Sequence, residues 1–302
     1  MSALFWRVFT VIGMQPIGRY FAGSTALALG VLLGTLPSLA LPVSPRSPAR
    51  AVNVALARAP RTMHPRTAPL GAPTPSGNGV LQKGGTVLVV GDSISFDLGQ
   101  ALSAQLAQTP LLVRNQGKPT SGLAVPAFYD WPAKLGRFLN LYHPQVVVVL
   151  LGANDDQGLY ANGHAAAFAS TEWQREYARR VNLLVAETKS AGAQLLWLSP
   201  PQMQDPTYDG YVSYVAGVAR QAVMSSGFGT WVSTRNVLTT TPGQFQLTGV
   251  VNGTVQQIRY ADGIHPTTAG SALLASFVVK LLRSDFGYRG PAHNLAALGR
   301  AK

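Results

Sequence analysis

Residues 86–93 read Thr-Val-Leu-Val-Val-Gly-Asp-Ser, an apolar run that ends in a glycine and two polar residues. A short apolar run bounded by a turn residue is typical of a strand with both faces covered. A helical pattern follows at residues 96–108, so Ser93 lies between a buried strand and a helix. In a parallel sheet, ligands bind at this position, beyond the carboxyl end of the strand.

The same alternation of apolar runs and helical patterns continues to the last helix. It predicts a three-layer α/β/α sandwich with a five-stranded parallel sheet and right-handed crossovers. Residues 244–260 interrupt the alternation, and Asn252-Gly253 within them predicts a tight β-hairpin beside the active-site edge. The expected strands are 86–90, 111–115, 145–151, 194–198 and 230–232, and the expected helices are 96–108, 131–141, 171–190, 211–225 and 267–283.

Two further polar clusters complete a possible catalytic set. Gly152-Ala153-Asn154-Asp155 follows the third strand, and Asp262-Gly263-Ile264-His265 precedes the last helix. A serine hydroxyl needs a base to become a nucleophile. His265 offers that base, Asp262 can orient its imidazole, and the Asn154 amide can donate to an oxyanion. Each cluster alone fits an ordinary turn or helix cap, but their joint occurrence indicates acyl transfer.

These residues resemble the four sequence blocks of the SGNH/GDSL hydrolase superfamily, over about 86–283. The blocks match Gly91-Asp92-Ser93, Gly122 within 120–123, Gly152-Ala153-Asn154-Asp155, and Asp262-Gly263-Ile264-His265. The resemblance implies a flavodoxin-like fold of the SGNH type. It also implies that Ser93 is the nucleophile, His265 the base and Asp262 its orienter. The implied oxyanion hole consists of the Ser93 and Gly122 N–H groups and the Asn154 amide.

The glycine block is the least specific of the four, because Gly117 competes with Gly122. We favour Gly122, since Ser121-Gly122-Leu123 followed by Phe-Tyr-Asp-Trp at 128–131 resembles a bacterial envelope branch of the superfamily. Members of that branch accompany polysaccharide synthesis and acylation systems, including cellulose synthase operons. The resemblance thus implies a serine esterase or O-acyltransferase for acyl groups, most simply acetyl, of a polysaccharide. Its partners would be an acylated glycan or small ester, and polysaccharide synthase or acyltransferase components.

Four other side chains near the blocks also receive roles. Tyr129 and Trp131 follow the glycine block and are predicted to line a sugar-stacking surface. Ser95 is predicted to cap the first helix, and Asp155 to support its loop through hydrogen bonds. Asp155 and Asp156 also suggest a metal site, but a site made of oxygen ligands needs more convergent groups than the sequence offers. We therefore expect no metal and no cofactor.

Two other classes of function stay open. One is a non-catalytic glycan-binding or scaffold subunit of a polysaccharide synthesis system, which the intact Ser93, Asn154, Asp262 and His265 argue against. The other is a phosphate-binding module at the 91–93 turn, which leaves Asp262 and His265 unexplained.

The formal net charge of +12 is concentrated near the amino terminus of the 302-residue chain. Residues 1–91 hold eight Lys and Arg residues and no Asp or Glu. Those within 42–83 are scattered among Pro and Ala without interleaved aromatic residues, so they indicate a solvated linker and no nucleic-acid partner. The sequence has no cysteine, which excludes disulfides, thiolate zinc sites and a cysteine nucleophile.

Residues 20–41 are uncharged and would form a helix about 33 Å long, sufficient to cross a bilayer. We interpret 1–41 as a signal peptide, with a cleavage site after Ala40, or as a membrane anchor. A flexible linker at 42–83, the hydrolase domain at 84–290 and a tail at 291–302 would follow. We expect a periplasmic or membrane-tethered protein. The arginines that follow the apolar stretch favour the opposite, cytoplasmic orientation, which stays the alternative.

Overall fold

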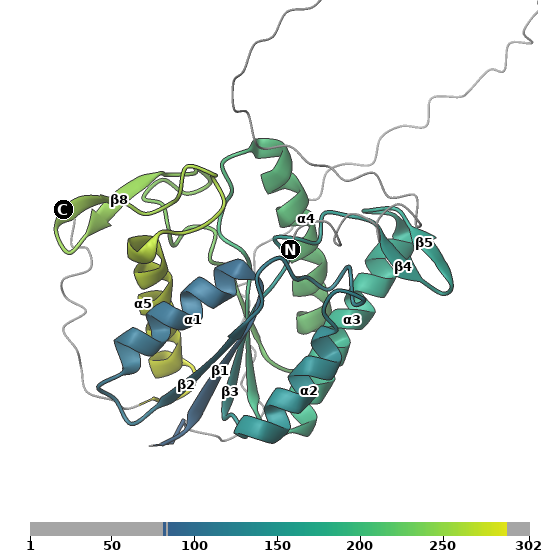
Figure 1. Ribbon diagram of the computed structural model, residues 1–302, viewed down its shortest axis with the longest axis horizontal. Helices are drawn as coiled ribbons and strands as arrows, with labels where there is room; N and C mark the ends of the chain where they lie inside the picture. Colours follow the sequence, from purple (N-terminus) through teal and green to yellow (C-terminus); the bar gives the residue numbers. More distant parts are fainter. Residues whose placement is uncertain (1–80, 83, 289–302) are drawn as a thin grey trace, which may run out of the picture. The chain divides into compact units, whose positions relative to one another are not determined.

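The computed structural model describes residues 81–82 and 84–288, which contain a five-stranded parallel sheet (Figure 1). The strands are hydrogen-bonded in the order β2-β1-β3-β6-β7, and every pair is parallel. The sheet predicted from the apolar runs is therefore confirmed. Its strands are β1 (Thr86–Gly91), β2 (Leu112–Gly117), β3 (Val146–Leu150), β6 (Gln194–Leu198) and β7 (Thr230–Val232).

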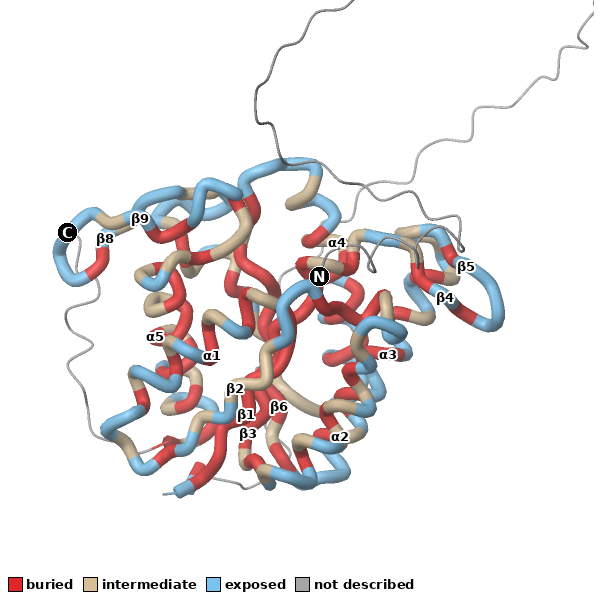
Figure 2. Tube along the Cα trace, in the orientation of Figure 1, coloured by how far each residue is buried: buried red, intermediate tan, exposed pale blue. Residues whose placement is uncertain are grey.

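Helices cover both faces of the sheet, so the predicted three-layer sandwich is also confirmed (Figure 1). Alternate residues of β1 point to opposite faces. Val87 and Val89 pack with α1 and α5, whereas Leu88 and Val90 pack on the side of α2, α3 and α4. Figure 2 shows the central strands buried between these layers. The helices are α1 (Ser93–Leu106), α2 (Trp131–Tyr142), α3 (Thr171–Ser190), α4 (Pro206–Ser225) and α5 (Thr268–Ser284).

Two helices begin earlier than the sequence pattern predicts, because aspartates cap them. Asp92 caps α1 by accepting from the Ile94 N–H, so the helix begins at Ser93 and not at residue 96. Ser95 is therefore not the cap, and its hydroxyl donates to the Asp92 carbonyl at 2.7 Å. Asp205 caps α4 in the same way, and α4 begins at Pro206 and not at residue 211.

Two small antiparallel hairpins project from the sandwich. The predicted hairpin is confirmed as β8 (Thr248–Val251) and β9 (Thr254–Gln257), with Asn252 and Gly253 at positive φ in its turn. A second hairpin, β4 (Leu159–Ala161) and β5 (His164–Ala166), was not predicted. Its turn is again an Asn-Gly pair at positive φ, Asn162 and Gly163, so the sequence held a signal for it.

The predicted anchor at 1–41, nearly all of the linker at 42–83 and the tail at 291–302 lie outside the described residues. Leu81 is an exception within the predicted linker. It is 4% exposed and packs in the core beside α1 and α5, and its N–H donates to the Phe286 carbonyl at 2.9 Å. The folded domain thus begins before residue 84. No helix within 84–288 combines the length and hydropathy that a membrane span requires.

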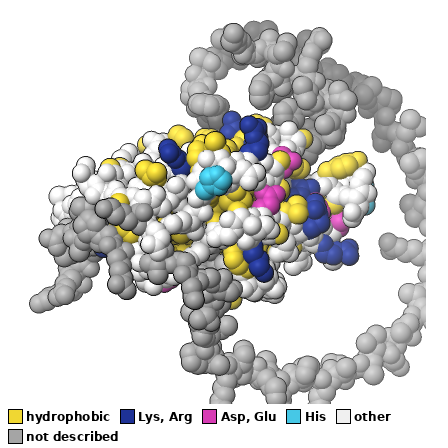
Figure 3. All heavy atoms as spheres, turned by 90° about the horizontal axis from the view of Figure 1, so that it is seen from below, with side chains coloured by type: hydrophobic (Ala, Val, Ile, Leu, Met, Phe, Trp, Pro, Cys, Tyr) yellow, Lys and Arg dark blue, Asp and Glu magenta, His cyan; other side chains and the backbone are white. Residues whose placement is uncertain are grey.

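The described domain is almost neutral. Residues 84–288 hold 13 Lys and Arg residues against 12 Asp and Glu residues, a formal net charge of +1. On the face shown in Figure 3, acidic and basic side chains are interspersed. The excess positive charge of the chain therefore belongs to sequence outside this domain.

Candidate active site

A serine, a histidine and an aspartate form a hydrogen-bonded chain at the carboxyl edge of the sheet. Ser93 opens α1 directly after β1, and its Oγ lies 2.8 Å from His265 Nε2. His265 Nδ1 lies 2.8 Å from Asp262 Oδ2, in the loop before α5. The structure thus brings together the three predicted triad residues, although Ser93 and His265 are 172 positions apart in sequence.

The Asp262 carboxylate is held in its charged form. Partial burial acts to raise its pKa, but hydrogen bonds from the backbone N–H groups of Ile264 (2.8 Å) and His265 (3.0 Å), and from the imidazole, lower the pKa below its usual range. An ionised carboxylate only accepts hydrogen bonds, so His265 Nδ1 is the protonated nitrogen. Nε2 is then the lone-pair nitrogen that faces the Ser93 hydroxyl.

Asp92 connects the nucleophile turn to the loop after β3. It is fully buried, and its two carboxyl oxygens accept from the N–H groups of Ile94 (3.0 Å) and Ala153 (3.3 Å). Burial raises the pKa of Asp92 to about 7, against the hydrogen bonds that act to lower it. The carboxyl group therefore fixes Ser93 and residues 152–155 relative to each other, and it titrates near neutral pH.

This raised pKa predicts a pH-dependent stability. Between pH 3.8 and about 7, the folded state holds the Asp92 proton and the unfolded state does not. The stabilisation from this proton is therefore complete below pH 3.8 and is lost as the pH rises to about 7. We expect the unfolding free energy of the wild type to fall relative to that of Asp92→Asn across this window. Urea unfolding of both proteins at several pH values measures the difference. If the two unfolding free energies changed with pH in the same way, Asp92 would not have the raised pKa.

Two of the three predicted oxyanion donors, Gly122 and Asn154, lie in two loops that Asp155 connects. The buried Asp155 carboxylate accepts from the Ala124 N–H at 2.7 Å and the Tyr177 hydroxyl at 2.8 Å, so it does support the loops. A side chain at Gly122 would overlap this carboxylate, and glycine therefore permits the close approach. Asn154 donates from Nδ2 to the Ser121 carbonyl at 2.9 Å, which places it against the same loop.

Backbone hydrogen bonding distinguishes the two glycines that competed for the glycine block. The Gly117 N–H donates to Asn115 Oδ1 at 3.1 Å. Within residues 84–288, the N–H groups of Gly122 and Ser93 donate to no acceptor. The N–H of Ser93 is one of the first-turn donors that a helix leaves unsatisfied. Gly122 and Ser93 thus keep the free donors that an oxyanion hole requires, whereas Gly117 does not.

The prediction that Trp131 lines a sugar-stacking surface is wrong. Trp131 is the first residue of α2, it is 1% exposed, and its indole N–H donates to Ser121 Oγ at 3.0 Å. Its ring faces the core and anchors α2 to the 121–124 loop. Tyr129 is half-buried and packs edge-on against Trp131, with 4.8 Å between ring centroids. Tyr129 and Trp131 both border a cavity of about 260 Å³ whose walls include Gly122 and Arg179 but none of the triad residues. At 1% exposure, Trp131 offers no ring face to a ligand there.

Trp131→Ala should therefore act on stability and not on substrate choice. Removal of a buried aromatic ring costs about 3–5 kcal/mol of unfolding free energy. At equal folded fraction, we expect activity on an aryl acetate and on an acetylated glycan to change to the same extent. Urea unfolding beside both assays checks this, with Trp131→Phe as the milder control. Selective loss of glycan activity without loss of stability would contradict it.

Arg259 is a site residue that the sequence analysis missed. It is 1% exposed, and its guanidinium donates to the carbonyls of Gln202 (2.7 Å) and Ile264 (2.6 Å). The same group lies 4.8 Å from the centre of the Phe245 ring. Burial lowers the pKa of Arg259 to about 10, so it stays charged at neutral pH. It therefore ties the loop that carries Asp262 and His265 to the loop after β6.

The described residues offer no evident metal centre. Within 84–288, no group of three or more His, Cys, Asp or Glu side chains converges as metal ligands would. The sequence suggested an oxygen-ligand site at Asp155. In the structure its carboxylate accepts hydrogen bonds from the Ala124 N–H and the Tyr177 hydroxyl.

Comparison with known proteins gives one family and several structural likenesses. A family model described as "Protein of unknown function (DUF459)" matches residues 86–281, from β1 into α5. No curated protein matches the sequence. Solved structures with similar backbones include a catalytic mutant of an acetylxylan esterase from Geobacillus stearothermophilus. The two sequences are 17% identical and the TM-score is 0.46, with coverage of 67% of this chain and 96% of that one.

Two other similar structures are also hydrolases by description. A GDSL-like lipase from Bacteroides thetaiotaomicron has 13% identity and a TM-score of 0.44, with coverage of 67% of this chain and 89% of that one. An alpha/beta hydrolase from the metagenome of Lake Arreo has 17% identity and a TM-score of 0.46, with coverage of 70% and 98%. Likeness at this level assigns no activity to this chain, so its chemistry has to follow from its own residues.

Proposed function

This chain belongs to the DUF459 family, and we propose that it is a serine-dependent carboxylic ester hydrolase or O-acyltransferase. The observation that carries the proposal is the continuous hydrogen-bonded chain from Ser93 through His265 to Asp262. The free N–H groups of Ser93 and Gly122, with the Asn154 amide in the adjoining loop, supply donors for an oxyanion.

In the first half of the reaction, Ser93 Oγ attacks the carbonyl carbon of the ester. His265 Nε2 accepts the hydroxyl proton, and the ionised Asp262 stabilises the resulting imidazolium. The bond between the carbonyl carbon and the alcohol oxygen then breaks. His265 returns its proton to that oxygen, the alcohol departs, and the acyl group stays on Ser93 as an ester.

In the second half, water or a sugar hydroxyl attacks the acyl group on Ser93. His265 removes the proton from the attacking oxygen and returns it to Ser93 Oγ. Attack by water releases the acid, whereas attack by a sugar hydroxyl transfers the acyl group. In both halves, negative charge collects on the former carbonyl oxygen, and each fixed donor to that oxygen contributes about 3 kcal/mol in such sites.

The finer proposal concerns the substrate and its location. We infer that the acyl group, most simply acetyl, is carried by an envelope or secreted polysaccharide. The protein would act in the periplasm, free or tethered to the membrane, beside polysaccharide synthase or acyltransferase components. The sequence blocks that resemble the envelope branch and the apolar stretch at 20–41 support this. A non-catalytic glycan-binding subunit is the alternative, and it would not need the triad geometry.

Labelling with a fluorophosphonate tests the proposed chemistry. We expect covalent modification of Ser93, located by peptide mass spectrometry, together with cleavage of an aryl acetate. Acetylated oligosaccharides, incubated with and without an acceptor glycan, then separate hydrolysis from transfer. A folded protein that neither reacts with the probe nor cleaves the ester would support the non-catalytic alternative.

A further inference from the structure

A cavity of about 290 Å³ lies between α1 and the first turn of α5, and Pro266, the residue after His265, is part of its lining. The two helices lie side by side in the layer that covers one face of the sheet (Figure 1). The cavity extends along α1 as far as Ala104. The lining residues with polar or large side chains are Asp97, Gln100, Tyr260, Pro266, Thr268 and Ser271.

Several contacts place this cavity on the His265 side of the nucleophile. Asp97 follows Ser93 by one helical turn, about 6 Å along the axis. Pro266 is the neighbour of His265 in sequence, and the Tyr260 N–H donates to the His265 carbonyl at 2.9 Å. Burial raises the pKa of the Asp97 carboxyl, and His265, once it has taken up the Ser93 proton, acts on that carboxyl in the opposite direction. The cavity lining includes no residue of the loops that carry Gly122 and Asn154.

The direction of proton transfer decides which half of an ester would lie in this cavity. His265 must give its proton to the oxygen of the departing alcohol, so the alcohol lies next to the imidazole. The carbonyl oxygen lies instead among the donors of Ser93, Gly122 and Asn154. On the proposed esterase chemistry, a cavity on the His265 side therefore receives the alcohol half of the substrate.

The lining of the cavity suits an alcohol that is uncharged and rich in hydroxyl groups. The Asp97 carboxylate is half-buried and accepts no hydrogen bond within residues 84–288, so it is free to accept from ligand hydroxyls. Gln100 and Thr268 add an exposed amide and an exposed hydroxyl, and the Tyr260 ring, 51% exposed, offers an apolar face. An alkyl chain would desolvate the carboxylate at a cost, and an anionic ligand would be repelled by it.

We propose that this cavity is the subsite for the alcohol half of the ester, and that it binds a neutral sugar ring. Asp97 and Gln100 bind hydroxyl groups of the ring, while Tyr260 packs against its apolar face. This assignment rests on the proposed ester chemistry at Ser93. It moves the expected contact with sugar from Trp131, which is buried, to the opening between α1 and α5.

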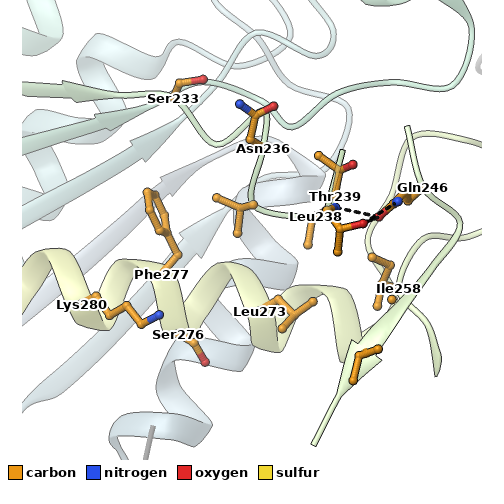
Figure 4. A pocket seen from close by; sticks show the side chains of 14 residues that line it. Ser233, Asn236, Leu238, Thr239, Gln246, Ile258, Leu273, Ser276, Phe277 and Lys280 are labelled. Carbon is orange, nitrogen blue, oxygen red and sulfur yellow. Dashed lines mark hydrogen bonds between the residues drawn. The ribbon is translucent and has the colours of Figure 1, made fainter. Parts of the chain in front are cut away.

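A larger cavity, of about 400 Å³, is a poorer candidate for this subsite (Figure 4). It lies between α5, the β8–β9 hairpin and the loop after β7, and its walls include Leu238, Leu273 and Phe277. Neither this cavity nor the one between α1 and α5 is lined by a triad residue, but only the latter includes a sequence neighbour of the triad, Pro266. The one cationic side chain of the larger cavity, Lys280, lies about three turns beyond the start of α5.

The test compares two substrates on the full-length protein and its variants. An aryl acetate reports the chemistry, and a neutral acetylated xylo-oligosaccharide reports the subsite. We expect Asp97→Asn and Tyr260→Ala each to lower the ratio of kcat/KM for the oligosaccharide to that for the aryl acetate by about tenfold or more, mainly through KM. Tyr160→Ala is the matched control. Tyr160 is 65% exposed, its hydroxyl donates to Gly163 in the β4–β5 turn, and its loss should leave the ratio unchanged.

The outcomes separate this inference from the proposed function. If the wild type cleaves both substrates and the ratio is unchanged in both variants, the subsite assignment is wrong and the esterase proposal stands. Cleavage of the aryl acetate but not of the oligosaccharide would overturn the subsite in the same way. Equal or better cleavage of an anionic acetylated glycan, or of an acetate of a long alkyl alcohol, would also overturn it. A folded wild type that cleaves neither substrate contradicts the esterase proposal and the subsite together.

Discussion

Ser93→Ala and His265→Ala should each abolish cleavage of an aryl acetate, with a loss in kcat of about 10⁴-fold or more. Ser93 Oγ forms the covalent bond and His265 Nε2, 2.8 Å away, moves the proton in both halves of the reaction. Because the two residues act as one unit, the double variant should be hardly worse than either single variant. Steady-state kinetics on all three proteins, with fluorophosphonate labelling of each, measures this.

Two matched control variants test whether the loss of activity is specific to Ser93 and His265. Ser95 is the other hydroxyl in the turn, and its Oγ is engaged with the Asp92 carbonyl at 2.7 Å, so Ser95→Ala should keep probe labelling. His164 lies on the β5 strand and contacts Glu172, so His164→Ala should keep full activity. Ser93 and His265 are only half-buried, and their alanine variants should unfold at a urea concentration close to that of the wild type. Turnover near the wild-type rate in either variant would show that the residue is not catalytic.

Asn154→Ala should lower kcat by about 10²–10³-fold with a smaller change in KM. The Asn154 amide carries two hydrogens on Nδ2, and one of them is committed to the Ser121 carbonyl at 2.9 Å. The other remains for the oxyanion, where it contributes most when negative charge develops in the transition state. Initial rates over a range of aryl acetate concentrations separate the effects on kcat and KM.

Gln157→Ala provides the control for this second result. Its side-chain amide donates to the Asn154 backbone carbonyl at 2.7 Å and is exposed, so the variant perturbs the same loop without removing the donor. We expect it to keep most of the wild-type kcat. If Asn154→Ala changed KM alone, Asn154 would be a substrate-binding residue and the oxyanion would depend on the backbone donors.

The sequence allowed the sheet to be predicted because its strands are unbroken apolar runs. Five consecutive buried residues in β3 leave little alternative to a strand covered on both faces. The starts of α1 and α4 were harder to locate, because their caps, Asp92 and Asp205, stand before polar or Pro-containing first turns that show no apolar period. The Asn162-Gly163 turn was missed because the strands it joins are three residues each.

Some residues of the candidate site could likewise be predicted from the sequence and others could not. Ser93, Asp262 and His265 were predicted from blocks whose residue types and spacing carry the chemistry. The function assigned to Trp131 failed because exposure depends on which face of α2 meets the sheet, and a first-turn residue carries little information on that face. Arg259 was missed for a related reason. Its partners are backbone carbonyls, one of them 57 positions away, so no pattern of side chains marks the contact.

The contact between Leu81 and Phe286 has a consequence for how this domain could be combined with others. The hydrogen bond of 2.9 Å between them means that the polypeptide enters and leaves the folded unit at one place. Such a unit can be inserted into a surface loop of another protein without stretching its host, and it tolerates circular permutation well. Because its two ends are adjacent, this fold has the geometry that insertion into another protein or circular permutation requires.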